Sequence, residues 1–326
     1  MSETVADYRK YLDPRVLAKV GSLELRARLI VEGLMTGMHR SPYQGISVEF
    51  AQHRPYAVGD DIRHVDWKVY SRTEKVYLKQ YQQETNLNLV CVVDSSESMG
   101  YGTVGARGEG QGVSGIIASL ATRSAPTSTW SKYDHATAIA ASLSYMAIQQ
   151  QDSVALAIFD ATLSRYFKPS NSPNQWKLVV NELQQVPRWN KTNTGKILDQ
   201  IAEKLTQRSL IVILSDFFDD LDSIRQGLRH LRYKKHEIMV FQILDPAEIE
   251  FPFQDVTLFK GMEESGELLT DPRALREGYL EQLRQFTDEL TKLCRGMDID
   301  FHRFSSGDSL DVSLSQFLAT RAATMK

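Results

Sequence analysis

Short, largely apolar runs alternate with longer amphipathic segments along most of this chain, and this alternation constrains its fold more than any other feature. The runs cover residues 88–93, 153–159, 209–214 and 237–244. Runs of this length and apolarity are typical of strands that are buried on both faces. A strand-then-helix order favours a mainly parallel sheet with helices on both faces. We therefore predict a doubly wound α/β fold for most of the chain.

The segments between and after these runs carry apolar residues at helical spacing. This pattern predicts helices over residues 133–149, 175–185, 194–205, 220–233, 273–295 and 310–322. A further strand is expected at 299–304. Short apolar pieces at 256–259 and 267–269 predict a hairpin, and the acidic residues between 245 and 267 are expected on its solvated surface.

The first part of the chain differs in pattern from the rest. Residues 22–38 read as an amphipathic helix, and residues 45–84 read as short extended pieces separated by turns, with a strand candidate at 76–78. We therefore predict a small N-terminal α+β module over residues 1–85 and an α/β domain over 86–326. Within the latter, residues 100–131 are rich in Gly, Ser and Thr and are predicted to form a flexible insertion.

Charge and composition exclude several classes of protein. The 38 Lys and Arg residues against 41 Asp and Glu residues give a net charge of −3, so no global positive field points to nucleic acid. The two cysteines, Cys91 and Cys294, exclude a disulfide framework and a Cys-based zinc site. No apolar stretch is long enough for a signal peptide or a membrane span, so we expect a cytoplasmic protein.

Polar residues follow two of the predicted strands directly. Asp94, Ser96 and Ser98 alternate after the first run, and Asp216 follows the third run. The carboxyl ends of parallel strands share one edge of a sheet, and ligands bind there in open α/β sheets. Carboxylate and hydroxyl oxygens suit a small hard cation such as Mg²⁺. Helix caps and Asx turns are the structural alternative for the same residues.

Hydroxyl groups also stand at the start of the helix predicted from residue 194. Thr192 and Thr194 lie in the segment Lys-Thr-Asn-Thr-Gly, so either could join the other polar groups at the sheet edge. Each could instead cap the helix. The residues alone leave this choice open.

Two parts of the chain resemble known families. The pattern Asp-x-Ser-x-Ser, with a Thr before a helix and an Asp after a later strand, resembles the metal-ion-dependent adhesion site of von Willebrand factor type A domains. Residues 54–72, with Arg-Pro-Tyr, Gly-Asp-Asp-Ile-Arg and Val-Asp-Trp, resemble the signature of the bacterial family called domain of unknown function 58 (DUF58). The implied metal ligands are Asp94, Ser96, Ser98, Thr192 and Asp216.

The resemblance implies a non-catalytic module that binds a protein partner through Mg²⁺ or Mn²⁺, with an acidic residue of the partner completing the coordination. It also implies a partner of the MoxR type of AAA+ ATPase, because members of the family often accompany such enzymes. The main alternative is a Mg²⁺-dependent hydrolase or phosphotransferase that uses the same cation. A third is a scaffold whose metal site is vestigial.

Two other charged or glycine-rich features have simpler explanations. Basic residues between 225 and 235 line one helix face and are expected to be solvated near the helix C-terminus. The pattern G-x-G-x-x-G at residues 110–115 does not follow a strand directly, which argues against a dinucleotide site.

Overall fold

The computed structural model of the chain describes residues 12–38, 53–55, 71–72, 76–79, 87–104, 130–185, 193–254, 257–260, 267–310 and 314–315. The chain divides into two compact units. The first comprises residues 1–38 and 87–326, and the second comprises residues 39–86. Among the described residues, no helix combines the length and the apolar character needed to cross a membrane.

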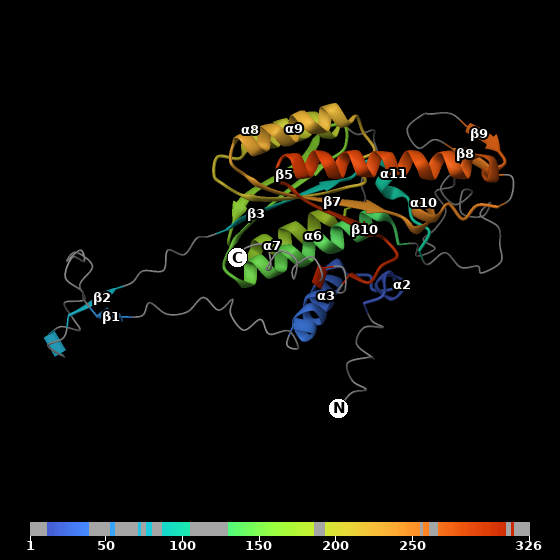
Figure 1. Cartoon of the computed structure of the whole chain (residues 1–326). Coiled ribbons are helices and arrows are strands. Elements are labelled where there is room, and N and C mark those ends of the chain that lie inside the picture. Colours follow the sequence, from blue (N-terminus) through green and yellow to red (C-terminus); the bar gives the residue numbers. More distant parts are fainter. Residues whose placement is uncertain are drawn as a thin grey trace. The chain divides into compact units, whose positions relative to one another are not determined.

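A six-stranded, mostly parallel sheet forms the centre of the first unit (Figure 1). Its strand order is β10-β7-β6-β3-β4-β5, and only β5 runs antiparallel to its neighbour. The six strands are β3 (Asn88–Asp94), β4 (Ser153–Phe159), β5 (Leu163–Ser170), β6 (Leu210–Ser215), β7 (Glu237–Leu244) and β10 (Asp300–Ser305). The sheet confirms the mainly parallel α/β arrangement.

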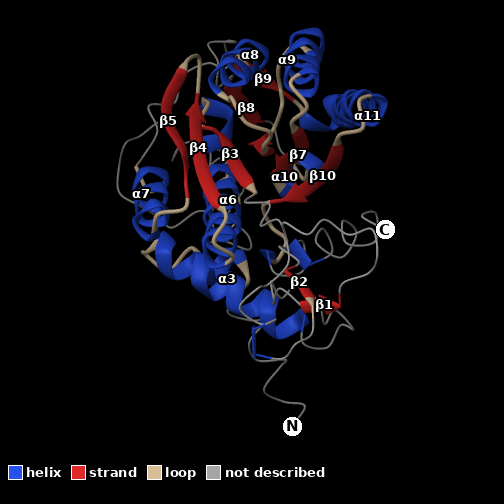
Figure 2. Ribbon diagram, turned by 90° about the vertical axis from the view of Figure 1, so that its left-hand side faces the viewer, coloured by secondary structure: helices blue, strands red, loops and turns tan. Residues whose placement is uncertain are grey.

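Helices cover both faces of this sheet (Figure 2). One face packs on α3 (Leu23–Met38), α6 (Lys132–Gln149) and α7 (Pro173–Leu183), and the other on α8 (Thr194–Lys204), α9 (Leu221–Tyr233) and α11 (Pro272–Gly296). Alternate residues of β3 divide between the two cores, with Cys91 facing the first group and Val92 the second. This division explains why the central strands are apolar throughout.

Helix α3 packs into the first core through Ala27, Ile30 and Leu34, which are fully buried. It therefore belongs to the α/β unit together with the short helix α2 (Pro14–Leu17). The sequence-based division had grouped this helix with the remainder of residues 1–85. Its apolar stripe needed a surface to cover, and the alanine-rich helix α6 supplies one.

The second unit contains an antiparallel pair of short strands among its described residues. Strand β1 (His53–Pro55) pairs with β2 (Tyr77–Lys79), which confirms the strand candidate at 76–78. The extended piece and the turn expected between residues 45 and 61 lie largely outside the described residues.

Smaller elements complete the first unit. The predicted hairpin is formed by β8 (Thr257–Lys260) and β9 (Glu267–Thr270). Two short helices, η2 (Glu97–Gly100) and α10 (Pro246–Glu250), follow β3 and β7. Most of the helix predicted at 310–322 lies outside the described residues.

The predicted insertion at 100–131 is described only at its two ends. Val104 and Trp130 form an antiparallel bridge, in which the Trp130 N–H donates to the Val104 carbonyl at 2.8 Å. Residues 105–129 lie outside the described residues, so the predicted flexibility of this segment stays a prediction.

Candidate metal-binding edge of the sheet

The strand order reverses between β3 and β6, and the predicted polar residues gather at this point. From β3 the chain continues to β4 and β5 on one side, and then returns to β6 on the other side of β3. Loops that leave neighbouring strands in opposite directions open a crevice at the carboxyl edge of an α/β sheet. Asp94 ends β3, and Asp216 directly follows β6.

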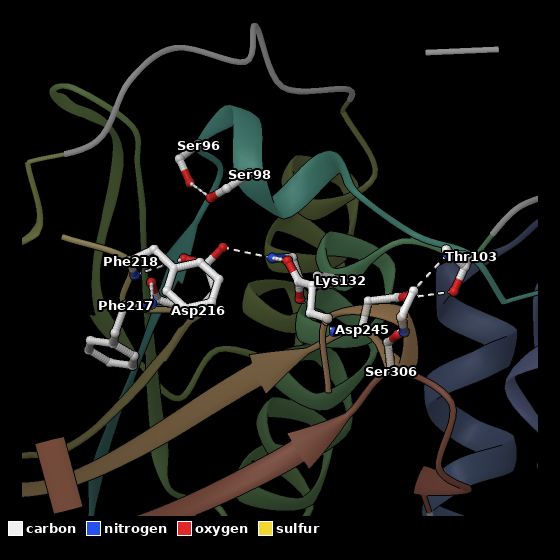
Figure 3. A network of polar contacts seen from close by, with 12 residues as sticks. Ser96, Ser98, Thr103, Lys132, Asp216, Phe217, Phe218, Asp245 and Ser306 are labelled. Carbon is white, nitrogen blue, oxygen red and sulfur yellow. Dashed lines mark hydrogen bonds and ion pairs between the residues drawn. The ribbon is translucent and has the colours of Figure 1, made fainter. Parts of the chain in front are cut away.

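Asp94 is fully buried, and hydrogen bonds from Ser96 and Ser215 hold its carboxylate. The Ser96 N–H donates to Asp94 Oδ1 at 2.8 Å, and the Ser215 hydroxyl donates to Asp94 Oδ2 at 2.5 Å. The hydroxyls of Ser96 and Ser98 lie 3.1 Å apart (Figure 3). Ser98 is only half buried, so it lies on the solvent side of the group. The structure thus brings together the Asp-x-Ser-x-Ser residues as predicted.

The loop after β6 is held in an unusual backbone conformation. Phe217 is buried and has a φ of 61°, which lies in the left-handed region that residues other than glycine rarely adopt. Its N–H donates to the Ser215 hydroxyl at 2.9 Å, and the Phe218 N–H donates to Asp216 Oδ1 at 3.2 Å. These bonds hold the Asp216 carboxylate at a position from which its charge acts on Asp94.

A lysine that the sequence analysis missed also binds Asp216. Lys132 is fully buried at the start of α6, and its Nζ donates to Asp216 Oδ2 at 2.8 Å and to Glu248 Oε1 at 2.6 Å. The Phe218 ring lies over this ammonium, with 5.3 Å between Nζ and the ring centroid (Figure 3). A helix N-terminus disfavours a positive charge, so a lysine there in the sequence was a signal that it needed acidic partners.

The carboxylates at this edge outnumber the cations among the described residues. Burial and the charge of Asp216 raise the pKa of Asp94 to about 7. Burial also raises the pKa of Glu248, although Lys132 opposes that shift. Burial alone would lower the pKa of Lys132, but Asp216 and Glu248 raise it above its usual range. Asp94 thus has no cationic partner among the described residues, whereas Asp216 and Glu248 share one.

A third carboxylate follows a strand of the same sheet. Asp245 directly follows β7 and is fully buried. It accepts hydrogen bonds from the Thr103 N–H at 3.0 Å, from the Thr103 hydroxyl and from the Ser306 hydroxyl at 2.9 Å. Its own N–H donates to Glu248 Oε2 at 2.8 Å. The expectation that this acidic segment is solvated was therefore wrong for Asp245 and Glu248.

The two threonines considered as ligands have different outcomes. Thr192 lies outside the described residues. Thr194 is buried at the start of α8, and its N–H donates to Asp219 Oδ2 at 2.7 Å. This bond connects the start of α8 to the loop that carries Asp216, so the third predicted loop reaches the same region.

Within the described part of the chain, no three His, Cys, Asp or Glu side chains are grouped as metal ligands. The predicted site depends on serine and threonine hydroxyls together with carboxylates, a donor set of a different kind. Asp94 with the hydroxyls of Ser96 and Ser98 forms a set of oxygen donors suited to a hard divalent cation.

Two solved structures that align with part of this chain share little sequence with it. A conserved hypothetical protein, BatB, from Bacteroides thetaiotaomicron is 13% identical, with a TM-score of 0.44, over 73% of this chain and 99% of that one. An aerotolerance-related membrane protein from Bacteroides fragilis is 12% identical, with a TM-score of 0.42, over 72% and 97%.

Sequence relatives cover almost the whole chain. Uncharacterised proteins of Mycobacterium bovis and Mycobacterium tuberculosis are 25% identical over 316 residues, which is 95% of this chain and 90% of theirs. The family described as protein of unknown function DUF58 matches residues 52–123 and 112–288. Because these matches span more than half of the sequence, the chain belongs to the DUF58 family.

Proposed function

We propose that this protein binds another protein through a divalent cation, Mg²⁺ or Mn²⁺, and catalyses no reaction. The observation that carries the proposal is the burial of the Asp94 carboxylate without a cation beside it among the described residues. Its carboxylate is fully buried beside two serine hydroxyls and has no cationic partner among the described residues. A buried charge of this kind is costly unless a cation or a proton compensates it.

The residues around Asp94 fit such a cation. In our proposal Ser96 and Ser98 turn their hydroxyls from each other to the cation. Thr192 joins them directly or through water, and Asp216 acts mostly through water. This set of residues follows the resemblance to von Willebrand factor type A domains, and the proposed fold type is the same. When bound, the cation would supply a positive charge that attracts a carboxylate of the partner.

The proposed partner is a cytoplasmic AAA+ ATPase of the MoxR type, which would present an Asp or Glu to the cation. The half-buried position of Ser98 gives this carboxylate a side from which to approach. The rival activity, hydrolysis or phosphoryl transfer, would need a base next to the cation. Asp94 and Asp216 are buried and already hydrogen-bonded, which favours the binding role.

Cation binding is tested by measuring the free energy of unfolding with and without Mg²⁺ or Mn²⁺. A cation at 100 times its dissociation constant that binds only the folded chain should add about 2.7 kcal/mol. Asp94→Asn should abolish this gain. Asp199→Asn, at a half-exposed residue of α8 that pairs with His230 of α9, should keep it. An equal gain in the Asp94 variant would place the cation elsewhere.

Partner binding is tested with a purified MoxR-type ATPase from the same organism. Binding to the immobilised chain should require Mg²⁺ and should fall with EDTA and with Asp94→Asn. Arg229→Ala, on the exposed basic face of α9, is the matched control and should bind normally. Undiminished binding in EDTA would refute a cation bridge, and Mg²⁺-dependent turnover of a phosphate ester that Asp94→Asn abolishes would establish the enzymatic alternative.

A further inference from the structure

The side chain of Lys132 occupies the space between Asp216 and Glu248 and is inaccessible to solvent (Figure 3). Its ammonium lies 2.8 Å from an oxygen of Asp216 and 2.6 Å from an oxygen of Glu248, and the Phe218 ring covers it. The stem leaves the first turn of α6, which is anchored by a capping box between Ser131 and Asp134. This lysine is therefore held away from solvent by two ion pairs.

The contacts of Lys132 leave the two aspartates at the sheet edge in unequal states. Both oxygens of Asp216 are engaged, Oδ2 by the Lys132 ammonium and Oδ1 by the Phe218 N–H at 3.2 Å. Asp94 accepts hydrogen bonds from the Ser96 N–H, from the Ser215 hydroxyl and from the Ser96 side chain, all of which are uncharged donors. Asp216 is thus paired with a cation, whereas Asp94 has no cationic partner among the described residues.

The charge balance follows from these contacts. Lys132 carries one positive charge that Asp216 and Glu248 share, so a cation beside Asp94 meets one carboxylate without a cationic partner and an Asp216 whose charge is partly offset by the ammonium. Affinity for divalent cations rises with the number of charged ligands. A site with one free carboxylate and several hydroxyls therefore binds a cation weakly and leaves coordination positions open.

We propose that the Lys132 ammonium prevents Asp216 from coordinating the divalent cation directly and so keeps the affinity of the site for that cation low. Coordination then depends on a carboxylate from the partner, and cation and partner bind together. The inference rests on the proposed function, because it concerns the same cation at Asp94. It assigns to Lys132 a positioning role that acts through Asp216.

The test is the affinity for Mn²⁺, measured on the purified chain by the loss of the electron paramagnetic resonance signal of free Mn²⁺. Lys132→Met keeps an unbranched apolar side chain, one atom shorter than lysine, and removes the charge. We expect Mn²⁺ to bind to this variant at least about tenfold more tightly than to the wild type, because Asp216 becomes a ligand. Lys132→Met/Asp216→Asn should lose the gain, and Lys132→Arg should resemble the wild type.

A second variant guards against failure of Lys132→Met to fold with two unpaired carboxylates. Lys132→Met/Glu248→Gln removes one charge of each sign, and the Gln oxygen can still accept from the Asp245 N–H that Glu248 now binds. It should show the same gain in affinity. Wild-type affinity in either folded variant, or a gain that persists with Asp216→Asn, overturns the inference.

The outcomes also separate this inference from the proposed function. Binding by the wild type that Asp94→Asn abolishes supports the proposed function whatever Lys132 does. Binding only after Lys132 is replaced supports the inference and refutes cation binding by the wild-type chain alone. Absence of Mn²⁺ binding in every folded variant overturns both.

Discussion

The buried imidazole of His135 should make the protein lose stability as the pH falls below 6.5. Its ring lies between Trp130 and Phe304, with ring centroids 6.3 and 6.5 Å away, and the Trp130 indole N–H donates to Nδ1 at 3.3 Å. Burial lowers the pKa of His135 to about 3 from its ordinary value of 6.5. Protonation would also place a second donor against the indole N–H.

The sign and size of the effect follow from proton linkage. Between pH 6.5 and pH 3 the unfolded chain binds a proton at this residue and the folded chain does not, so the free energy of unfolding falls as the pH falls. The full slope is about 1.4 kcal/mol per pH unit. Between pH 7.5 and pH 5, His135 should therefore lower the free energy of unfolding by about 2 kcal/mol.

The assay is urea denaturation, followed by circular dichroism, of the wild type and of His135→Asn at several pH values. The Asn side chain keeps an acceptor near the position of Nδ1 but does not titrate. It should lower stability at pH 7.5, because it leaves a small cavity, and should remove about 2 kcal/mol of the loss between pH 7.5 and pH 5. Trp130→Phe is the matched control, since it perturbs the same contact but keeps the imidazole and hence the slope. Parallel stability curves for the wild type and His135→Asn would refute the reasoning.

Three further substitutions should change stability in ways that urea denaturation can measure. Gly195→Ala should lower the free energy of unfolding by about 1–3 kcal/mol or more, because a Cβ there would lie 2.1 Å from Ser223 Oγ and 2.3 Å from the Ser223 carbonyl oxygen. An unchanged denaturation midpoint would contradict this packing. Asp245→Asn should lower the free energy of unfolding by about 1.5–3 kcal/mol, since the buried carboxylate accepts hydrogen bonds from the N–H and the hydroxyl of Thr103. An unchanged free energy would show that these bonds contribute little. Lys235→Gly should instead raise the free energy of unfolding by about 0.5–1 kcal/mol, because this exposed residue at the end of α9 has a φ of 63°, which glycine adopts more readily than lysine. A loss of stability would contradict this prediction.

The central strands and the edge strand β10 were predictable from the sequence, whereas the other edge strand, β5, was not. Strands β3, β4 and β6 are buried on both faces, so their sequences are continuously apolar. Strand β5 pairs on one side only, is half exposed, and carries Arg165, Lys168 and Pro169. Proline is tolerated at a sheet edge but argues against a strand in a sequence, so the pattern of β5 resembled a loop.

The acidic half of the candidate site was also predictable, because parallel strands place their carboxyl ends side by side. Asp94 and Asp216 each follow an apolar run and meet at the reversal of strand order. Asp245 follows such a run too, but the acidic residues after it suggested a solvated surface. The position of the Lys132 ammonium could not be predicted from strand ends. Lys132 comes from the start of a helix and follows a segment of about thirty residues rich in glycine, serine and threonine.

The position of Lys132 changes what the Asp-x-Ser-x-Ser pattern implies. The pattern specifies a carboxylate and two hydroxyls in one loop, but the affinity of such a loop for a cation depends on which charges lie behind it. Here a lysine from another element neutralises Asp216, while Asp94 stays without a cationic partner among the described residues. The same motif could therefore bind a cation tightly on its own or only together with a partner's carboxylate. If this chain binds a cation as we propose, the buried ammonium favours the second, and cation binding and partner binding should be linked.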